Sequence, residues 1–261
     1  MIESGANGKY KKIQKLMKHA RTRRQEQVFV VEGWKMVKEA LTRRMVRRLY
    51  CSQQEESVCV EMLQTSGNQE IPVEVMRDTL FRQLSDTVTP QGILGIVQMP
   101  VYSREEILSS PEAKLLFLEN IQDPGNLGTM FRTAEGAGMS GVVLSGGCVD
   151  LFNPKVVRST MGALFRVPYY ICGDMAEEMR LLQKRRFHFY AAHLQGTKNF
   201  TEESYEGCVG ILIGNEANGL SDQAAQQADI QIKIPMEGEL ESLNAAVSAA
   251  LLMYEVHRNR E

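Results

Sequence analysis

Hydrophobic and polar positions along the chain repeat one pattern, a short apolar strand followed by an amphipathic helix. Residues 115–118 and 209–213 are almost wholly apolar, which is typical of strands buried on both faces of a parallel sheet. Elsewhere apolar residues recur every three or four positions, as at Leu127, Met130 and Phe131, which predicts a helix with one buried side. Strands alternating with helices predict an α/β fold.

The same pattern predicts two domains. In residues 1–100 we expect helices near 9–24, 34–44 and 55–65 and strands near 28–31, 46–50, 71–75 and 92–97. Residues 101–112 are mostly polar, border or contain two prolines and fit a linker. Residues 113–261 then form the larger α/β domain, with strands near 115–118, 142–145, 187–192, 209–213 and 230–234.

The stretch 230–254 places polar side chains where a strand meets a helix. Ile230, Ile232 and Ile234 alternate with polar residues, and a helix is expected to begin near Ser242. Its predicted buried stripe is Leu243, Val247, Ala250, Leu251 and Tyr254. Ser242 and Asn244 therefore fall at a strand end, where ligands of open α/β sheets bind, although Ser242 would also serve as a plain N-cap.

Two further stretches, 118–138 and 211–222, show the same succession of strand, polar turn and helix. Three such junctions indicate one site assembled from three loops. In the first stretch Asn126 is a good N-cap, and Arg132 lies off the buried stripe and points away from the core. The alternative for Arg132 is an ordinary surface ion pair with Glu135.

Composition limits the possible classes of protein. The chain has 261 residues, 43% of them hydrophobic, and no apolar run approaches the length of about 18–20 residues that a membrane span needs. Its five cysteines contain no CxxC pair and its four histidines show no ligand spacing, so we expect a reduced cytoplasmic protein without a structural metal. The N-terminus lacks the apolar core of a signal peptide, and no G-x-G-x-x-G supports a Rossmann domain.

Charge is distributed unevenly. Residues 1–48 hold 14 Lys and Arg against four Asp and Glu, whereas the remainder holds 16 against 28. This basic end is the candidate contact for a phosphate-rich partner, with a solvated helix face as the alternative. The side chains proposed for RNA binding are Lys11, Lys12, Lys15, Arg23 and Arg24. A smaller basic cluster at 184–186 would suit either RNA or the C-terminal dipole of a helix.

Three motifs carry a resemblance to a known family. They are Asn126-x-Gly128-x-x-x-Arg132, Ile213-Gly214-Asn215-Glu216-x-x-Gly219-Leu220, and Ile234-Pro235-Met236 followed by Ser242-Leu243-Asn244. In this order they resemble the signature of the SpoU (TrmH) family of the SPOUT class, whose members are RNA ribose 2′-O-methyltransferases. Residues 1–100 resemble the small substrate-binding domain that often precedes the catalytic domain.

The resemblance implies a trefoil-knotted α/β catalytic domain that is mainly parallel, with helices on both faces, and that forms homodimers. It implies S-adenosylmethionine as cofactor, in a pocket around Gly214, Ile234, Ser242, Leu243 and Asn244. It also implies catalytic roles for Arg132, Asn126, Glu216, Ser242 and Asn244. Because a guanidinium stays protonated in proteins, we expect Arg132 to hold a phosphate and stabilise the forming oxyanion.

The expected substrate is rRNA, with 23S rRNA favoured, because a dedicated basic domain suggests recognition at a distance from the reacting nucleotide. A tRNA methyltransferase and a non-catalytic RNA-binding or assembly factor on the same scaffold are the alternatives. Retention of all five candidate catalytic residues argues against the non-catalytic reading.

Overall fold

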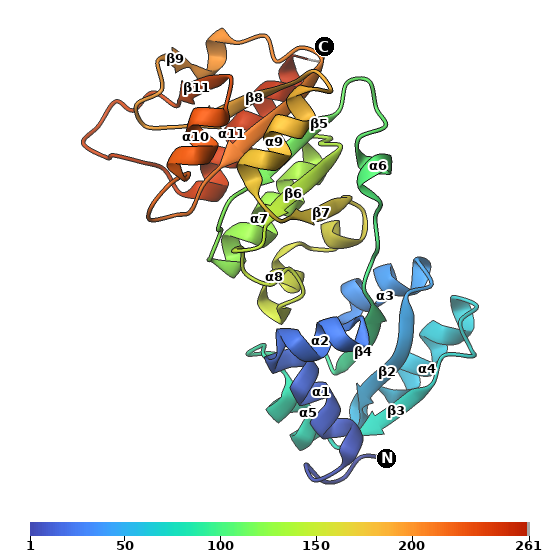
Figure 1. The fold of residues 1–261 in the computed structure, drawn as a ribbon. Coiled ribbons are helices and arrows are strands. Elements are labelled where there is room, and N and C mark those ends of the chain that lie inside the picture. The colour runs from blue at the N-terminus through green and yellow to red at the C-terminus, as the bar shows by residue number, and fades with distance from the viewer. Residues whose placement is uncertain (260–261) are drawn as a thin grey trace. The chain divides into compact units, whose positions relative to one another are not determined.

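The computed structural model describes residues 1–259, which form two compact units. The first unit contains Met1–Val101 together with Phe152–Phe165, and the second contains Tyr102–Leu151 and the chain from Arg166 onward. Figure 1 colours the chain from its N-terminus to its C-terminus.

The first unit is built on a four-stranded sheet of order β1-β4-β2-β3, in which β4 runs antiparallel to both neighbours. Its elements are α1 (Gly8–Lys18), α2 (Ala20–Glu26), β1 (Val28–Glu32), α3 (Trp34–Thr42), β2 (Val46–Ser52), α4 (Glu56–Thr65), β3 (Val73–Met76), α5 (Asp78–Leu84), β4 (Ile93–Gln98) and α8 (Pro154–Ser159). One helix was predicted over residues 9–24. The structure has two, because His19 adopts an extended conformation (φ −119°, ψ 110°) that interrupts the helical hydrogen bonds.

The second unit is built on a seven-stranded, fully parallel sheet of order β7-β6-β5-β10-β8-β11-β9. Its elements are α6 (Arg104–Ile107), β5 (Lys114–Leu118), α7 (Pro124–Gly136), β6 (Gly141–Ser145), β7 (Tyr169–Cys172), α9 (Met175–Gln183), β8 (Phe187–Ala192), β9 (Lys198–Asn199), β10 (Cys208–Ile213), α10 (Asp222–Gln227), β11 (Ile230–Lys233) and α11 (Ala245–Arg258). The predicted α/β class is confirmed, whereas the edge strands β7 and β9 were not predicted.

Helices cover both faces of this sheet. Leu115 and Phe117 of β5 pack in one core cluster with Met179 of α9 and Ala224 of α10. The intervening Leu116 is also fully buried and, since side chains alternate along a strand, points to the opposite face, where α7 and α11 pack. Burial on both faces explains the continuous apolar runs in the sequence. Within residues 1–259, no helix combines the length and the apolar character that crossing a bilayer requires.

The predicted buried stripe of α11 is wrong. Val247, Leu251 and Tyr254 are 47%, 40% and 50% exposed. The buried side is instead formed by Ala246, Ala249, Leu252, Met253 and Val256. Both sides of this helix are apolar, so periodicity alone could not distinguish them. Small alanine side chains on the inner side allow α11 to pack closely against α7.

Candidate active site

The site begins where two neighbouring strands end at the same level. Leu118, the last residue of β5, pairs with Ile213, the last residue of β10, and the N–H of Glu119 donates to the carbonyl oxygen of Ile213 at 2.9 Å. The loops that follow these strands therefore start side by side. This is the carboxyl edge of a parallel sheet, where open α/β folds bind ligands.

Side chains from all three predicted junctions meet in one hydrogen-bonded chain. Asn126 of α7 donates through Nδ2 to Oε1 of Glu216 at 3.1 Å. Asn244 donates through its own Nδ2 to Oδ1 of Asn126 at 3.0 Å. Asn126 thus links the loop after β10 to the segment that precedes α11, although its two partners lie 90 and 118 residues further along the chain.

Glu216 is held as an acceptor. The backbone N–H groups of Gln122 and Asp123 donate to its two carboxylate oxygens, each at 3.1 Å. Burial by itself would raise the pKa of Glu216, but these hydrogen bonds and the one from Asn126 outweigh it, so the pKa lies below its ordinary value. A carboxylate that is ionised and already occupied by donors serves to position neighbouring groups.

The residues that cap α7 and α11 decide which asparagine side chains are available to the site. The predicted N-cap of α7 was wrong, and the alternative reading of Ser242 as the cap of α11 does not hold. Asp123, not Asn126, caps α7 by accepting from the N–H of Asn126 at 2.7 Å, with Pro124 in the first turn. The side chain of Asn126 is therefore available to Glu216. Asn244, not Ser242, caps α11, because its Oδ1 accepts from the N–H groups of Ala246 and Val247 at 2.9 and 3.3 Å.

Residues that the sequence analysis missed fix the loops beneath this chain. Asn120 has a left-handed backbone (φ 55°), and its carbonyl oxygen accepts from Nδ2 of Asn215 at 2.8 Å. Gln122 donates through Nε2 to the carbonyl oxygen of Gly147 at 2.6 Å, which joins the loop after β6. Buried Glu119 accepts from the N–H and the hydroxyl of Ser221 at 2.7 and 2.8 Å. The polar run Glu119–Asp123 after a buried strand was the available signal.

Arg132 and Ser242 stand apart from the hydrogen-bonded chain. Arg132 lies on α7 fewer than two turns beyond Asn126, and its side chain is exposed. Within residues 1–259 neither Arg132 nor Ser242 forms a side-chain hydrogen bond or ion pair. The surface pair with Glu135 does not form, because Glu135 accepts instead from Arg166, through Nη2 at 2.9 Å. The guanidinium of Arg132 is thus free to bind another molecule.

The loop after β10 and the segment before α11 provide an open cradle. A Cβ atom on Gly214 would lie 2.1 Å from the carbonyl carbon of Gly219, so only glycine permits this fold of the loop. Ile234 and Leu243 are partly exposed apolar side chains. Among the described residues, the main-chain groups of residues 235–243 form no backbone hydrogen bond. They are therefore available to the polar edge of a ligand.

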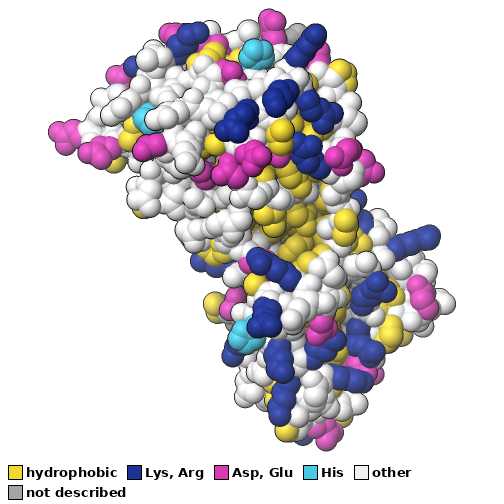
Figure 2. Space-filling view, in the orientation of Figure 1, with side chains coloured by type: hydrophobic (Ala, Val, Ile, Leu, Met, Phe, Trp, Pro, Cys, Tyr) yellow, Lys and Arg dark blue, Asp and Glu magenta, His cyan; other side chains and the backbone are white. Residues whose placement is uncertain are grey.

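In the first unit, helices α1 and α2 present a basic surface, hereafter the α1–α2 surface. Lys11, Lys12, Lys15 and Arg24 are exposed on it, and Figure 2 shows Lys and Arg side chains gathered over these two helices. Arg23 is the exception, since it is only 2% exposed and its Nη1 donates to the carbonyl oxygens of Leu16 and Met17 at 2.6 and 3.0 Å. Its predicted contact with RNA is wrong, because it stabilises the end of α1 instead.

Comparison with known proteins identifies the family. The model of the SpoU rRNA methylase family matches residues 113–254, more than half of the chain. The chain belongs to this family. Residues 7–95 match a second model, the MRM3-like substrate binding domain. Within the part of the chain that the structure describes, no cluster of His, Cys, Asp or Glu could hold a metal ion.

Two of the similar proteins match nearly the whole chain. It is 33% identical over 254 residues to the 23S rRNA (guanosine(2553)-2′-O)-methyltransferase RlmP of Bacillus subtilis, covering 97% of each protein. The crystal structure of the SpoU methyltransferase AviRb from Streptomyces viridochromogenes in complex with AdoMet matches with a TM-score of 0.88 at 27% identity, covering 97% of this chain and 98% of that one. A structure concerned with 2-OH methylation of C/U34 on tRNA covers only 58% of this chain, with a TM-score of 0.53 at 26% identity.

Membership in the SpoU family makes this protein an RNA ribose 2′-O-methyltransferase that uses S-adenosylmethionine. The cradle around Gly214 and residues 235–243 suits that cofactor. It offers unpaired main-chain donors and acceptors for polar edges and, in Ile234 and Leu243, apolar side chains for a flat ring.

Proposed function

We propose that this protein methylates a ribose 2′-hydroxyl of 23S rRNA. The observation that carries this choice of substrate is the extent of the match. A relative named as a 23S rRNA methyltransferase corresponds to the chain along 97% of its length, including the first unit, whereas the tRNA-related structure corresponds to only 58%. We also propose that residues 1–100 bind the RNA, that 113–261 carry out catalysis and that 101–112 connect them. The cytoplasm, where rRNA and the methyl donor meet, is the proposed location.

For the reaction we propose a division of labour among the site residues. The cofactor supplies an electrophilic methyl group. Arg132 holds the phosphate of the target nucleotide with its guanidinium and lowers the energy of the developing 2′-oxyanion, whose proton passes to solvent. Asn126, Glu216 and Asn244 fix the three loops against each other, so that hydroxyl and methyl group are aligned. Ser242, Leu243, Ile234 and Gly214 line the cofactor cradle.

We propose that the protein acts as a homodimer through its second unit. The exposed side of α11 supports this, since Val247, Leu251 and Tyr254 are 40–50% exposed and form an apolar stripe that water alone would face in a monomer. A Cβ atom on Gly136 would lie 3.2 Å from the Tyr254 hydroxyl, so Arg132, one helical turn before Gly136, lies beside this stripe. Such a position would let Arg132 serve the site of the neighbouring subunit.

We further propose the trefoil knot that the SpoU resemblance implies. The contact of Asn244 with Asn126 supports it, because it brings the segment after β11 back to the helix that follows β5, an inner strand of the sheet. An experimental structure traced continuously from residue 208 to residue 258 would test the threading, and a chain that closes without passing through a loop would refute it.

The test of function is methylation in vitro. Purified protein is incubated with methyl-labelled S-adenosylmethionine and either 23S rRNA or bulk tRNA from cells that lack the enzyme, and 2′-O-methylnucleosides are identified by mass spectrometry. We expect one labelled ribose in 23S rRNA. Label confined to tRNA would favour the tRNA alternative. The non-catalytic alternative is tested by unfolding the protein with and without S-adenosylmethionine. A methyltransferase should gain about 2.7 kcal/mol in its free energy of unfolding when the cofactor is present at 100 times its dissociation constant. A protein that does not bind the cofactor should gain nothing.

A further inference from the structure

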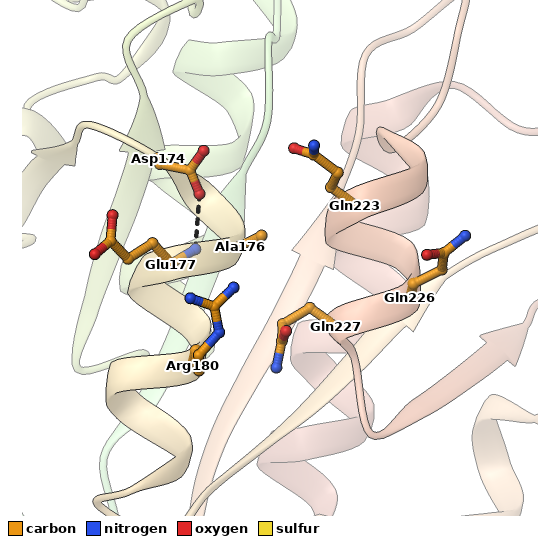
Figure 3. Close-up of a pocket in the computed structure, with 7 residues that line it drawn as sticks. All are labelled: Asp174, Ala176, Glu177, Arg180, Gln223, Gln226 and Gln227. Atoms are coloured by element: carbon orange, nitrogen blue, oxygen red, sulfur yellow. Dashed lines mark hydrogen bonds between the residues drawn. The ribbon is translucent and has the colours of Figure 1, made fainter.

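A polar groove opens between α9 and α10 of the second unit, away from the hydrogen-bonded chain of the active site. It encloses about 580 Å³, which lies within the range of small-molecule sites. Its lining residues are Asp174, Ala176, Glu177, Arg180, Gln223, Gln226 and Gln227. Figure 3 shows the side chains of Arg180 and Gln227 directed into the space between the two helices.

The chemistry of this lining suits a nucleobase better than a phosphate. Two carboxylates and one guanidinium leave the groove without excess positive charge, so a phosphate would meet net repulsion. Three carboxamides offer donors and acceptors together, which match the mixed donor and acceptor edges of bases. RNA-binding proteins read unpaired bases through such edge contacts.

Hydrogen bonds join the two walls of the groove. Gln227 donates through Nε2 to Oε1 of Gln183 at 2.6 Å, and Gln183 donates in return to the carbonyl oxygen of Gln227 at 3.0 Å. Gln183 also donates to Oδ1 of Asp229 at 3.1 Å, which fixes the end of the α10 wall. On the α9 wall, Asp174 accepts from the N–H of Glu177 at 2.7 Å. Gln223 is exposed on the α10 wall, and Figure 3 shows its side chain directed toward α9.

The groove and the active site share one anchor. The helices α9 and α10 follow parallel strands, so their first turns lie at the carboxyl edge of the sheet, the edge that carries Glu216. Glu119 holds the cap residue of α10, Ser221, and directly precedes the loop whose N–H groups bind Glu216. A base in the groove would consequently keep a fixed distance from the reacting ribose.

Cations continue the path along α9. Beyond Arg180, the side chains of Lys184 and Arg186 are exposed, and neither forms an ion pair within residues 1–259. Such cations beside a base-binding groove provide contacts for the connecting phosphates, which position a strand without reading its sequence.

We propose that the α9–α10 groove binds the base of an RNA nucleotide that flanks the methylated one, and so contributes to the choice of target. This rests on the proposed rRNA methyltransferase function. Gln223 contacts the edge of the base, Arg180 lines the groove from the α9 side, and Lys184 and Arg186 contact the adjoining phosphates.

The test combines a variant of the protein with changes in the RNA. In Gln223→Ala we expect kcat/KM for a 23S rRNA fragment that the wild type methylates to fall by about fivefold to 150-fold, the range for one lost base contact. The value of kcat at saturating RNA and the dissociation constant of S-adenosylmethionine should stay unchanged. The matched control is Gln195→Ala, at an exposed glutamine of the second unit outside the groove and the hydrogen-bonded chain, which should behave as wild type.

Fragments with one abasic nucleotide, placed in turn at each position flanking the target, then locate the contact. At one position the abasic change should lower kcat/KM for the wild type and have no further effect in the variant, since the contact is already lost. If at every position the abasic change lowers kcat/KM by the same factor in the variant as in the wild type, the proposal is overturned. Saturable binding of free nucleoside monophosphates, lost in the variant without any effect on RNA, would instead indicate a nucleotide site and also overturn it.

Failure of the two proposals is distinguishable. If the wild type methylates no 23S rRNA, the proposed function fails and the subsite fails with it. If the wild type methylates the fragment and the glutamine variant matches it in kcat/KM, only the subsite is wrong.

Discussion

Arg132 is the residue whose substitution should separate catalysis from cofactor binding. It is exposed and makes no polar contact with the cofactor cradle among residues 1–259. We expect Arg132→Ala to lower kcat by at least about a hundredfold to a thousandfold, as loss of one oxyanion-stabilising donor does. The dissociation constant of S-adenosylmethionine, measured by calorimetry, should change little. Arg82→Ala, at another exposed arginine, is the control, and equal loss of affinity and rate in Arg132→Ala would contradict the assignment.

Glu216 should give the site a defined dependence on pH. Its pKa in the folded protein lies below the ordinary 4.5, so the unfolded chain takes up the proton first as pH falls. The stability contributed by the carboxylate is fully present above pH 4.5 and is lost as pH falls through the folded pKa. The free energies of unfolding of the wild type and of Glu216→Gln, measured in urea, should therefore differ by a constant amount near neutral pH. That difference should shrink in acid, and a difference that grows below pH 4.5 would contradict this account.

At the level of single elements, the start of α11 separates a structural cap from a site residue. Asn244 caps the helix and also binds Asn126, so Asn244→Ala should lower the free energy of unfolding by about 1 kcal/mol and reduce methylation. Ser242→Ala should leave stability unchanged, because Asn244 supplies the cap. Urea titration of both variants is the measurement. A larger loss of stability in the serine variant would place the cap at Ser242 after all.

The α1–α2 surface should bind RNA through charge. Joint replacement of Lys11, Lys15 and Arg24 by glutamate should weaken RNA binding, and the slope of log K against log salt should become shallower by about one for each lost phosphate contact. Fluorescence anisotropy with a labelled rRNA fragment at several salt concentrations measures both effects. An unchanged slope would leave the solvated helix face as the correct interpretation.

Arg23 should behave differently from its neighbours although it lies in the same basic run. Its guanidinium satisfies two carbonyl oxygens at the end of α1, so Arg23→Ala should lower the free energy of unfolding by about 1–3 kcal/mol. The salt dependence of RNA binding should stay that of the wild type. A flattened slope at unchanged stability would return Arg23 to the RNA-binding group.

For the molecule as a whole, the expected assembly is a dimer whose subunits complete each other's sites. Leu251→Asp places a charge on the apolar stripe of α11 and should shift sedimentation from dimer to monomer and abolish methylation.

If Arg132 acts across the interface, an Arg132→Ala subunit mixed with a Gly214→Val subunit, defective in the cradle, should recover about a quarter of the wild-type activity. Recovery of none would place Arg132 in the site of its own subunit, and a monomeric, active wild type would refute the assembly.

Much of the second unit was predictable from single positions. Parallel strands that are buried on both faces appear in the sequence as apolar runs. The three motifs follow β5, β10 and β11, and there hydrogen bonds join Asn126, Glu216 and Asn244. Which side of α11 is buried was not predictable, since apolar residues lie on both sides and only the contact with α7 selects one. The roles of Asp123 and Asn126 were also exchanged, because each can cap a helix and the choice depends on what else the side chain can reach.

The sequence by itself determined the alternation of strands and helices, the family signature and the segregation of positive charge toward the N-terminus, because these depend on residue type and spacing along the chain. Tertiary structure alone decided which polar groups find partners. Arg23 is buried and donates to carbonyl oxygens, and Glu135 accepts from Arg166. Gln122 and Glu119 form hydrogen bonds that hold the loops of the site. Hydrogen bonding depends on distances of about 3 Å between atoms up to 118 residues apart in the chain, and spacing along the chain does not encode such distances.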